Sequence, residues 1–418
     1  MTGRRGETSS MPGMQGPAGT SMSRRRFLAS AGRIGAGAAA ASLLAACGVG
    51  GTADDEEAQS EPRTLPPLAE ELVIAQWPLY IDQVKGSSPT LKMFERRTGI
   101  DTTYKEVIND NQEFFAKLRE PLSQGRETGW DIITLSDWVV AKMVRLGWLE
   151  SLDYSLLPNV TANLGKAFRD PAYDPGNAHS VPWQGGITGI AYNPSLTGRS
   201  ITSFADLWDE SFAGHVGMLT EMVDTMSITL LTMGVDLKKA TIDDAERAQE
   251  RLLRQRDAGI VRGYYGNNYA NGLARGDLWA TMAWSGDVFQ LQLDDPDLQF
   301  VVPDEGGMLW ATPLEIPKGA KHPRDAHAFM DFVYQPEIAA QIAEWVGYIT
   351  PVPAAQEVIR EHVGEAKSKA DGDYLETLAG SPLVFPTKEM QSQLHDYKVL
   401  SAEEEQTWNE LFQTVVSG

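Results

Sequence analysis

The stretch from Leu278 to Asp287 presents an aromatic ring and a carboxylate at the point where a short apolar run stops. The run ends at Trp284 and is followed by Ser285, Gly286 and Asp287. A run of this length is typical of a buried strand, and the Ser-Gly pair indicates a turn after it. A tryptophan face attracts an ammonium group through its quadrupole, and an aspartate attracts it by charge. The residues therefore predict a cation site, although a buried strand capped by a turn aspartate fits them too.

Two other predicted strands also end in aromatic residues. The run at 72–75 leads into Trp77 and Tyr80, and the run at 131–135 leads into a loop of three residues, Ser136, Asp137 and Trp138. Ligand contacts in α/β folds gather beyond the carboxyl ends of strands. We therefore expect these rings and the Trp284 segment to face one cleft.

The elements that must position these residues alternate along the chain. Apolar runs at 72–75, 100–104 and 131–135 are separated by helical patterns, so the first part predicts a parallel sheet covered by helices. A second α/β unit follows, with a predicted strand at 215–219 and a helix that begins near Glu221 and Asp224. Those two carboxylates either face the cleft or only complement the helix dipole, and both interpretations stay open.

Two glycine pairs indicate where the chain passes between the two units. The segment 181–193 carries Gly185-Gly186 among extended residues, and 304–312 carries a second pair before Trp310. We interpret the first segment as a crossing with hinge freedom and the second as the return crossing. The predicted domains are lobe I, at 71–185 and 310–356, and lobe II, at 186–309 and 357–418.

Size and charge exclude some classes of protein. The 418 residues are 42% hydrophobic and carry a formal net charge of −21, enough chain for two lobes around substantial cores. Residues 1–46 hold six arginines and one glutamate, a net charge of +5, so the remainder carries −26. Nucleic acid is therefore not an expected partner.

The N-terminal segment has the pattern of an export signal. Arg24-Arg25-Arg26-Phe27 precedes an Ala- and Gly-rich apolar run that ends in Ala45-Ala46-Cys47, the one cysteine of the chain. This resembles a twin-arginine signal peptide at 1–46 with a lipoprotein cleavage site, which implies that Cys47 is lipidated. Residues 47–70 then form a flexible tether, so we expect the lobes on the outer face of the cell membrane.

Several motifs together resemble the spermidine/putrescine-binding proteins of ABC transporters. The similarity runs in order from Leu72 to the C-terminus, in Trp77 with Tyr80, Phe94 to Ile100, Trp284-Ser-Gly-Asp287, Glu305 to Trp310 and Gly347-Tyr348 with Thr350-Pro351. The resemblance implies a two-lobed α/β periplasmic-binding-protein fold of type II that closes on a ligand between its lobes. It also implies a cationic amine as ligand, no cofactor, a permease in the membrane as partner, and a monomeric protein.

The resemblance implies which residues hold the ligand. Rings that enclose its methylene chain fall on Trp77, Tyr80, Trp138, Trp284, Trp310 and Tyr348. Polar positions fall on Ser136 and Asp287. Acidic positions of the family fall instead on residues without charge, namely Leu79, Met222 with its companion Thr225, and Thr312. Glu221 and Asp224 flank the lost helix position and Asp137 lies beside the ring position Trp138, so we expect a relocated carboxylate or a different amine.

Two other functions remain open at this point. Tyr264-Tyr265 is a pair of the kind that ferric-ion-binding proteins of related fold use. A secreted hydrolase lacks sequence support, since the chain has no G-x-S-x-G elbow, no phosphate loop and no cysteine besides Cys47. The histidines show no metal-ligand spacing, and we expect no enzyme activity and no bound metal.

Overall fold

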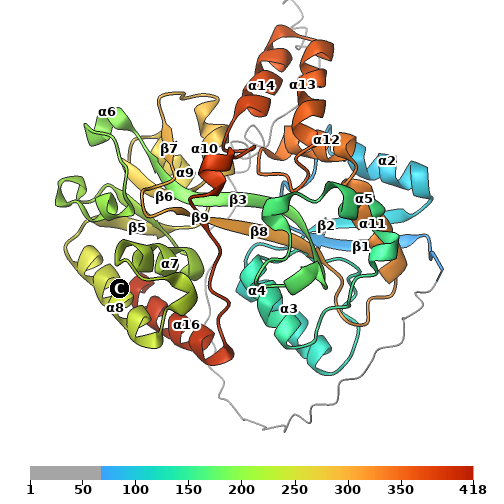
Figure 1. The fold of residues 1–418 in the computed structure, drawn as a ribbon, viewed down its shortest axis with the longest axis horizontal. Helices are drawn as coiled ribbons and strands as arrows, with labels where there is room; N and C mark the ends of the chain where they lie inside the picture. The colour runs from blue at the N-terminus through green and yellow to red at the C-terminus, as the bar shows by residue number, and fades with distance from the viewer. Residues whose placement is uncertain (1–66, 418) are drawn as a thin grey trace, which may run out of the picture.

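The computed structural model describes residues 67–417, which fold into two α/β lobes that lie side by side (Figure 1). The predicted signal peptide, Cys47 and most of the tether lie outside the described residues. Within the range that is described, no helix has both the length and the apolar character needed to cross a membrane. The two-lobed α/β architecture predicted from the sequence is present.

The first lobe is built on a parallel pair of strands. β1 (Glu71–Gln76) and β2 (Asp101–Glu106) pair in parallel, and α2 (Pro89–Thr98) connects them. The helix begins after Ser88, whose side chain accepts a hydrogen bond from the Leu91 amide, and it ends at Gly99 with a φ of 77°. The other helices of this side are α3 (Asn111–Ser123), α4 (Asp137–Arg145), α5 (Pro158–Asn163), α11 (Pro323–Val333) and α12 (Pro336–Val346).

The third strand predicted for this lobe is reduced to single bridges. Ile132 pairs with Ile74 and Ile133 pairs with Glu315, but residues 131–135 form no continuous ladder. The prediction of a strand here was therefore wrong in extent. The segment still runs beside β1 and delivers Ser136 to the start of α4, as the end of a strand would.

Two long antiparallel strands join the lobes. β3 (Ser180–Tyr192) pairs with β8 (Gly307–Glu315) from Ser180 opposite Glu315 to Thr188 opposite Met308. The seven-stranded sheet has the order β5-β4-β6-β3-β8-β9, with β7 also paired to β3. Its remaining strands are β4 (Val216–Leu219), β5 (Val261–Tyr265), β6 (Ala280–Trp284), β7 (Gln299–Val301) and β9 (Leu394–His395).

The Gly185-Gly186 pair has a packing role in addition to the hinge freedom that we expect of it. Both residues lie inside β3, which is buried along its whole length. A Cβ at Gly185 would come within 2.6 Å of the Phe168 ring, and one at Gly186 within 2.2 Å of the Trp310 ring. The glycines are needed because aromatic rings pack directly on the backbone of the crossing strand.

The second lobe and the C-terminal part are mostly helical around this sheet. Thr241 and Asp244 form a capping box at the start of α8 (Ile242–Asp257). The C-terminal helix α16 (Ala402–Val416) packs on α8, and its Trp408 and Phe412 are buried. The other helices are α6 (Pro194–Thr197), α7 (Met222–Thr232), α9 (Tyr269–Ala274), α10 (Ser285–Gln292), α13 (Ala355–Glu365), α14 (Lys369–Gly380) and α15 (Lys388–Gln391).

Apolar side chains form two separate cores. The larger core extends from β1 through the crossing strands into the second lobe. The smaller core lies under α3 and α4 and includes Phe114, Phe115, Val140 and Met143. Because α4 is held by the smaller core, its N-terminus is fixed beside the crossing strands where the candidate site lies.

Candidate functional site

The loop after β1 places two of the predicted rings. The Trp77 indole donates a hydrogen bond to the Thr134 carbonyl at 2.9 Å, and the ring stays half-buried. Leu79 adopts a φ of 64°, and its amide donates to the Glu106 carboxylate at 3.0 Å. This backbone turn brings Tyr80 under the Trp77 ring, with the ring centroids 6.5 Å apart.

Asp287 lies in the first turn of a helix and not in the turn that we predicted. Because α10 begins directly after β6, Ser285 and Gly286 are helical. The Asp287 carboxylate is only 9% exposed and accepts hydrogen bonds from Asn267 at 2.9 Å, Tyr269 at 3.0 Å and Tyr348 at 2.8 Å. These neutral donors hold a negative charge in place without cancelling it.

Tyr348 connects the predicted rings to one another. Its ring lies over Gly286, where a Cβ would come within 1.5 Å of the ring. It makes edge contacts with Tyr80 at 6.1 Å and with Trp310 at 5.6 Å, measured between ring centroids. Trp77, Tyr80, Tyr348 and Trp310 therefore form one continuous row of rings that reaches from β1 to the return crossing.

Asp224 lies on the other side of Trp284. The Trp284 indole donates to the Asp224 carboxylate at 3.4 Å, and the Tyr397 hydroxyl makes a short hydrogen bond to its other oxygen. Asp224 is 2% exposed, and this burial raises its pKa. Asp224 therefore does more than complement the dipole of α7, because its oxygens are directed to partners from β6 and from the C-terminal part of the chain.

Asp137 fixes the start of α4 to the return crossing. Its carboxylate accepts hydrogen bonds from the Ala311 amide at 3.0 Å and from the Trp138 amide at 2.7 Å. Ser136 precedes the helix, and its hydroxyl accepts a hydrogen bond from Asn111 at 2.9 Å. Asp137 and Trp138 are helical residues and not the loop residues that we expected, and they bring a buried carboxylate and a half-buried indole to the junction of the lobes.

Four carboxylates from different elements influence one another here. The pKa of Asp137 is raised to about 7, mainly by burial, with smaller contributions from the charges of Asp224 and Asp396. Burial also raises the pKa of the Glu221 carboxyl to about 8, with Asp224 and Asp137 among the charges that add to the effect. A cation that binds beside these groups would favour their ionised forms and lower their pKa values.

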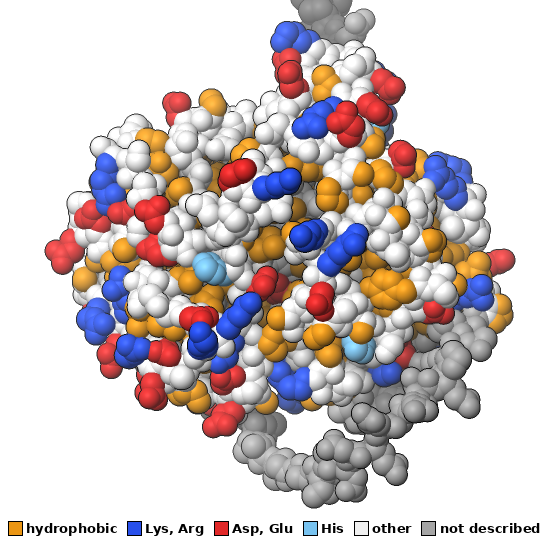
Figure 2. Space-filling view, in the orientation of Figure 1, with side chains coloured by type: hydrophobic (Ala, Val, Ile, Leu, Met, Phe, Trp, Pro, Cys, Tyr) orange, Lys and Arg blue, Asp and Glu red, His pale blue; other side chains and the backbone are white. Residues whose placement is uncertain are grey.

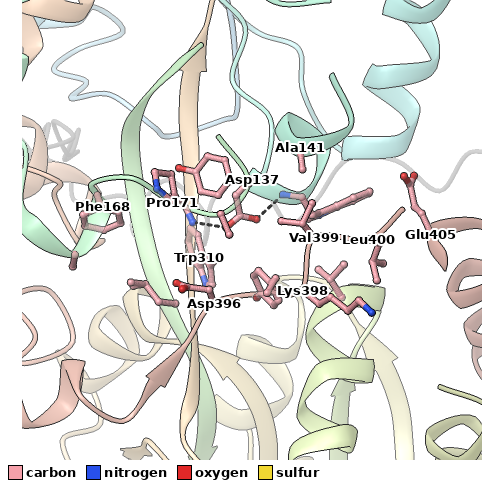
Figure 3. A pocket seen from close by; sticks show the side chains of 18 residues that line it. Asp137, Ala141, Phe168, Pro171, Trp310, Asp396, Lys398, Val399, Leu400 and Glu405 are labelled. Atoms are coloured by element: carbon pink, nitrogen blue, oxygen red, sulfur yellow. Dashed lines mark hydrogen bonds between the residues drawn. The ribbon is translucent and has the colours of Figure 1, made fainter. Parts of the chain in front are cut away.

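A pocket opens at this junction (Figure 3). It encloses about 690 Å³, counting the solvent at its open side. Asp137 from α4 and Asp396 from the C-terminal part of the chain both border it (Figure 3). Of the residues predicted for the site, Asp137, Trp138 and Trp310 line the pocket, whereas Trp77, Tyr80, Trp284, Asp287 and Tyr348 form the packed cluster of rings and carboxylate described above.

Sequence reasoning missed several residues at the site. Asn267 and Tyr269 bind Asp287, and Asp396 and Tyr397 reach the site from a segment just before α16. The Asn267-Asn268-Tyr269 run was the one signal for the first pair, because side-chain donors cluster there before a helix. Asp396 and Tyr397 carry no local signal, since their segment has neither strand nor helix pattern.

Buried, uncharged side chains occupy the positions where the resemblance implies carboxylates. Leu79 and Met222 are buried, and the Thr225 hydroxyl donates to the Leu219 carbonyl at 2.8 Å. Thr312 is also buried and donates to the Gln184 carbonyl at 3.3 Å across the crossing strands. None of these four side chains carries charge, so any ammonium group must be neutralised by the other carboxylates.

The tyrosine pair that suggested a ferric ion lies elsewhere. Tyr264 and Tyr265 are on β5 at the edge of the sheet, and the Tyr264 ring contacts Phe412 of α16 at 6.2 Å. Neither residue lines the pocket. Among residues 67–417, no group of three or more His, Cys, Asp or Glu side chains is placed to hold a metal ion.

Comparison with known proteins identifies the relatives of this chain. It is 31% identical over 327 residues to spermidine/putrescine-binding periplasmic protein 1 of Haemophilus influenzae, covering 78% of this chain and 86% of the relative. It is 25% identical over 350 residues to the putrescine/agmatine-binding protein of Pseudomonas aeruginosa, covering 79% of this chain and 88% of the relative.

Solved structures of proteins described in similar terms superpose on this chain. The spermidine/putrescine ABC transporter substrate-binding protein PotD of Streptococcus pneumoniae superposes with a TM-score of 0.68 at 25% identity, covering 83% of this chain and 98% of PotD. A Listeria monocytogenes protein described as a spermidine/putrescine ABC transporter gives 0.69 at 27% identity, covering 83% of this chain and 99% of that one. Residues 90–374 match the family described as bacterial extracellular solute-binding protein. The chain belongs to this family of solute-binding proteins.

Proposed function

We propose that this protein captures a polyamine, or a related cationic amine, between its lobes and delivers it to the permease of an ABC importer. The observation that carries the proposal is the row of rings from Trp77 to Trp310, with carboxylates hydrogen-bonded beside it at Asp287 and Asp224. An alternation of apolar faces and negative charge suits a ligand that alternates methylene chains and ammonium groups.

The half-buried tryptophans are the surfaces that a ligand would cover. Trp77, Trp138, Trp284 and Trp310 all keep part of their surface exposed, whereas Trp183 and Trp408 are core residues at 4% and 2% exposure. Covering an indole face with a methylene chain removes apolar surface from water on both partners. The tryptophans therefore favour ligands with an aliphatic segment over small inorganic cations.

We infer closure of the lobes from the fact that the rings belong to different lobes. Trp77 and Trp138 belong to the first lobe and Trp284 to the second, with Trp310 on the crossing strand between them. A ligand that contacts both lobes binds the closed form more tightly, so it shifts the population toward closure. The proposed lobes are 71–185 with 310–356 and 186–309 with 357–418, and we propose that the closed monomer is what the permease recognises.

We further propose that the protein is exported by the twin-arginine route and held on the outer face of the cell membrane by lipid on Cys47. The arginine run, the short Ala- and Gly-rich segment and the small residues before Cys47 support this. Residues 47–70 would then give the lobes reach above the membrane surface.

A thermal-shift panel tests the proposed ligand. The Cys47→Ser chain, which cannot be lipidated, would be heated with spermidine, spermine, putrescine, agmatine, arginine, choline and ferric citrate. A ligand that binds the native state raises the melting temperature by mass action. A saturable shift with polyamines supports the proposal, and a shift with ferric citrate alone would replace it with an iron carrier.

A further inference from the structure

A cluster of three charged residues joins the lobes outside the rings. Glu405 lies in the first turn of α16. One of its carboxylate oxygens is 2.6 Å from Lys142 Nζ, and the other is 3.1 Å from a guanidinium nitrogen of Arg145. Arg145 also donates to the Leu400 carbonyl at 2.8 Å. Charged side chains of both signs lie over the middle of the face in Figure 2, where α4 and α16 approach each other in Figure 1.

The partners belong to different lobes. Lys142 and Arg145 are on α4, whose apolar side is anchored in the smaller core by Val140 and Met143. Glu405 is on α16, which packs on α8 and α7 of the second lobe. Neither apolar core includes these charged side chains, and the ion pairs run from α4 of one proposed lobe to α16 of the other.

The burial of the Glu405 carboxylate makes its two ion pairs sensitive to closure of the lobes. The Glu405 side chain is 9% exposed, against 23% for Lys142 and 34% for Arg145. A carboxylate removed this far from water is stable only with both cations in place. Lys142 is held independently of Glu405, because its ammonium group lies 4.4 Å from the Phe115 ring centroid within the first lobe. The cationic half of the contact is therefore prepared before the lobes close.

The same contacts hold the segment that covers the pocket. Residues 396–400, which we name the C-terminal strap, run from β9 toward α16 and line the pocket with Asp396 and Tyr397. The Arg145 bond to Leu400 fixes the end of the strap to the first lobe, and Tyr397 fixes its middle to Asp224. Closing the ion pairs therefore also sets the position of Asp396 at the pocket.

We propose that Lys142, Arg145 and Glu405 form an ionic latch that favours the closed form and raises ligand affinity without contacting the ligand. Glu405 borders the pocket, but each of its oxygens already accepts a cationic donor. The latch thus acts through the open–closed equilibrium and through the strap. Its effect on affinity rests on the proposed function, whereas its effect on closure does not.

Distance measurements without ligand test the latch directly. In the full chain carrying Cys47→Ser, fluorophores would be attached at Lys117→Cys on α3 and Lys239→Cys beyond α7, two exposed positions in different lobes. We expect 1 M NaCl to lengthen the mean distance in the parent, because salt screens ion pairs. Glu405→Gln should show the longer distance already at low salt and respond little to added salt.

Ligand titrations complete the test. We expect Glu405→Gln to weaken spermidine binding about tenfold, within the range usual for coupled equilibria. Lys142→Gln in that background should cost less than it does alone, since the partner is already lost. The matched control is Glu403→Gln, which removes an equal charge from an exposed position in the same helical turn and should bind as the parent does.

Two results would overturn the proposal. One is a Glu405→Gln protein with the parent's distance and the parent's response to salt. The other is loss of spermidine binding with an unchanged ligand-free distance, which would make Glu405 a direct ligand contact. If the parent binds no amine at all, the proposed function fails, while the ligand-free distances still decide whether the latch exists.

Discussion

Replacing Gly286 with alanine tests whether Tyr348 organises the site. A Cβ at this position would lie 1.5 Å from Cδ1 and 1.9 Å from Cε1 of the Tyr348 ring. Carbon atoms prefer a separation of about 3.5–4.0 Å, so the ring has to move by roughly 2 Å. Tyr348 is 2% exposed and is packed between Tyr80 and Trp310, so it has no open space to enter.

The expected cost follows from the contacts that the ring makes. Overpacking a core costs about 1–3 kcal/mol, and losing the Tyr348 hydrogen bond to the Asp287 carboxylate costs about 1.5–3 kcal/mol. Alanine at a helical position gains back about 1 kcal/mol. We therefore expect Gly286→Ala to lower the free energy of unfolding by roughly 2–5 kcal/mol and to weaken amine binding at least tenfold.

Urea titration followed by tryptophan fluorescence gives the stability, and calorimetry with spermidine gives the affinity. Gly364→Ala is the matched control, because Gly364 lies in α13 with no atom within 4 Å of an added Cβ, and it should be neutral or slightly stabilising. In a Tyr348→Ala background the added methyl group should cost little. A Gly286→Ala protein with the parent's stability and affinity would refute the proposed role of Tyr348.

Three further predictions concern charge, pH dependence and anchoring. Asp287→Asn keeps the shape of the side chain but removes its charge, so we expect about 10- to 100-fold weaker binding of putrescine by calorimetry, with equal affinity contradicting the assignment. Because Asp137 and Glu221 have raised pKa values of about 7 and 8, a bound cation should release their protons. Putrescine affinity should then rise between about pH 6 and pH 8, and the calorimetric heat should vary with the ionisation enthalpy of the buffer. Cys47→Ser should move the protein from the membrane to the soluble fraction of cells, and retention in the membrane fraction would exclude lipid on Cys47 as the anchor.

The raised pKa values also fix the sign of the pH effect on stability. A carboxyl whose pKa is higher in the folded protein than in the unfolded chain binds more protons when folded. The free energy of unfolding therefore falls as pH rises from about 4 toward 7 for Asp137, and toward 8 for Glu221. The same groups that favour cation binding at higher pH thus weaken the empty protein there.

Local sequence patterns were sufficient for the elements that carry the rings. Trp77, Trp138 and Trp284 each follow an apolar run, and a strand or a short extended segment does end at or shortly before each of them. The strand at 215–219 and the helix that begins near Glu221 were predicted correctly for the same reason, because each pattern depends on residues close in sequence.

The structural features that local patterns did not predict depend on residues distant in sequence. Residues 131–135 have the composition of a strand, but they pair only through single bridges, one to Ile74 of β1 and one to Glu315. Gly185-Gly186 looks like a flexible pair, and only the positions of Phe168 and Trp310 reveal that it is needed for close packing. Asp396 approaches Asp137 across a separation of 259 positions, which no local pattern records.

On the proposed function, the ligand's ammonium groups lie beside carboxylates other than those at the acidic positions that the resemblance implies. An ammonium group requires a carboxylate within reach, but the strand or helix that supplies it is immaterial to the electrostatic interaction. Here Leu79, Met222 and Thr312 pack into the protein, while Asp137, Asp224 and Asp396 arrive at the junction from α4, α7 and the strap. Because two of these elements belong to the second lobe and one to the first, the repulsion among the three acids opposes closure of the empty protein. On the proposed function, a cation bound between them reverses that repulsion, and we expect these charges to link ligand capture to closure more directly than carboxylates on a single lobe would.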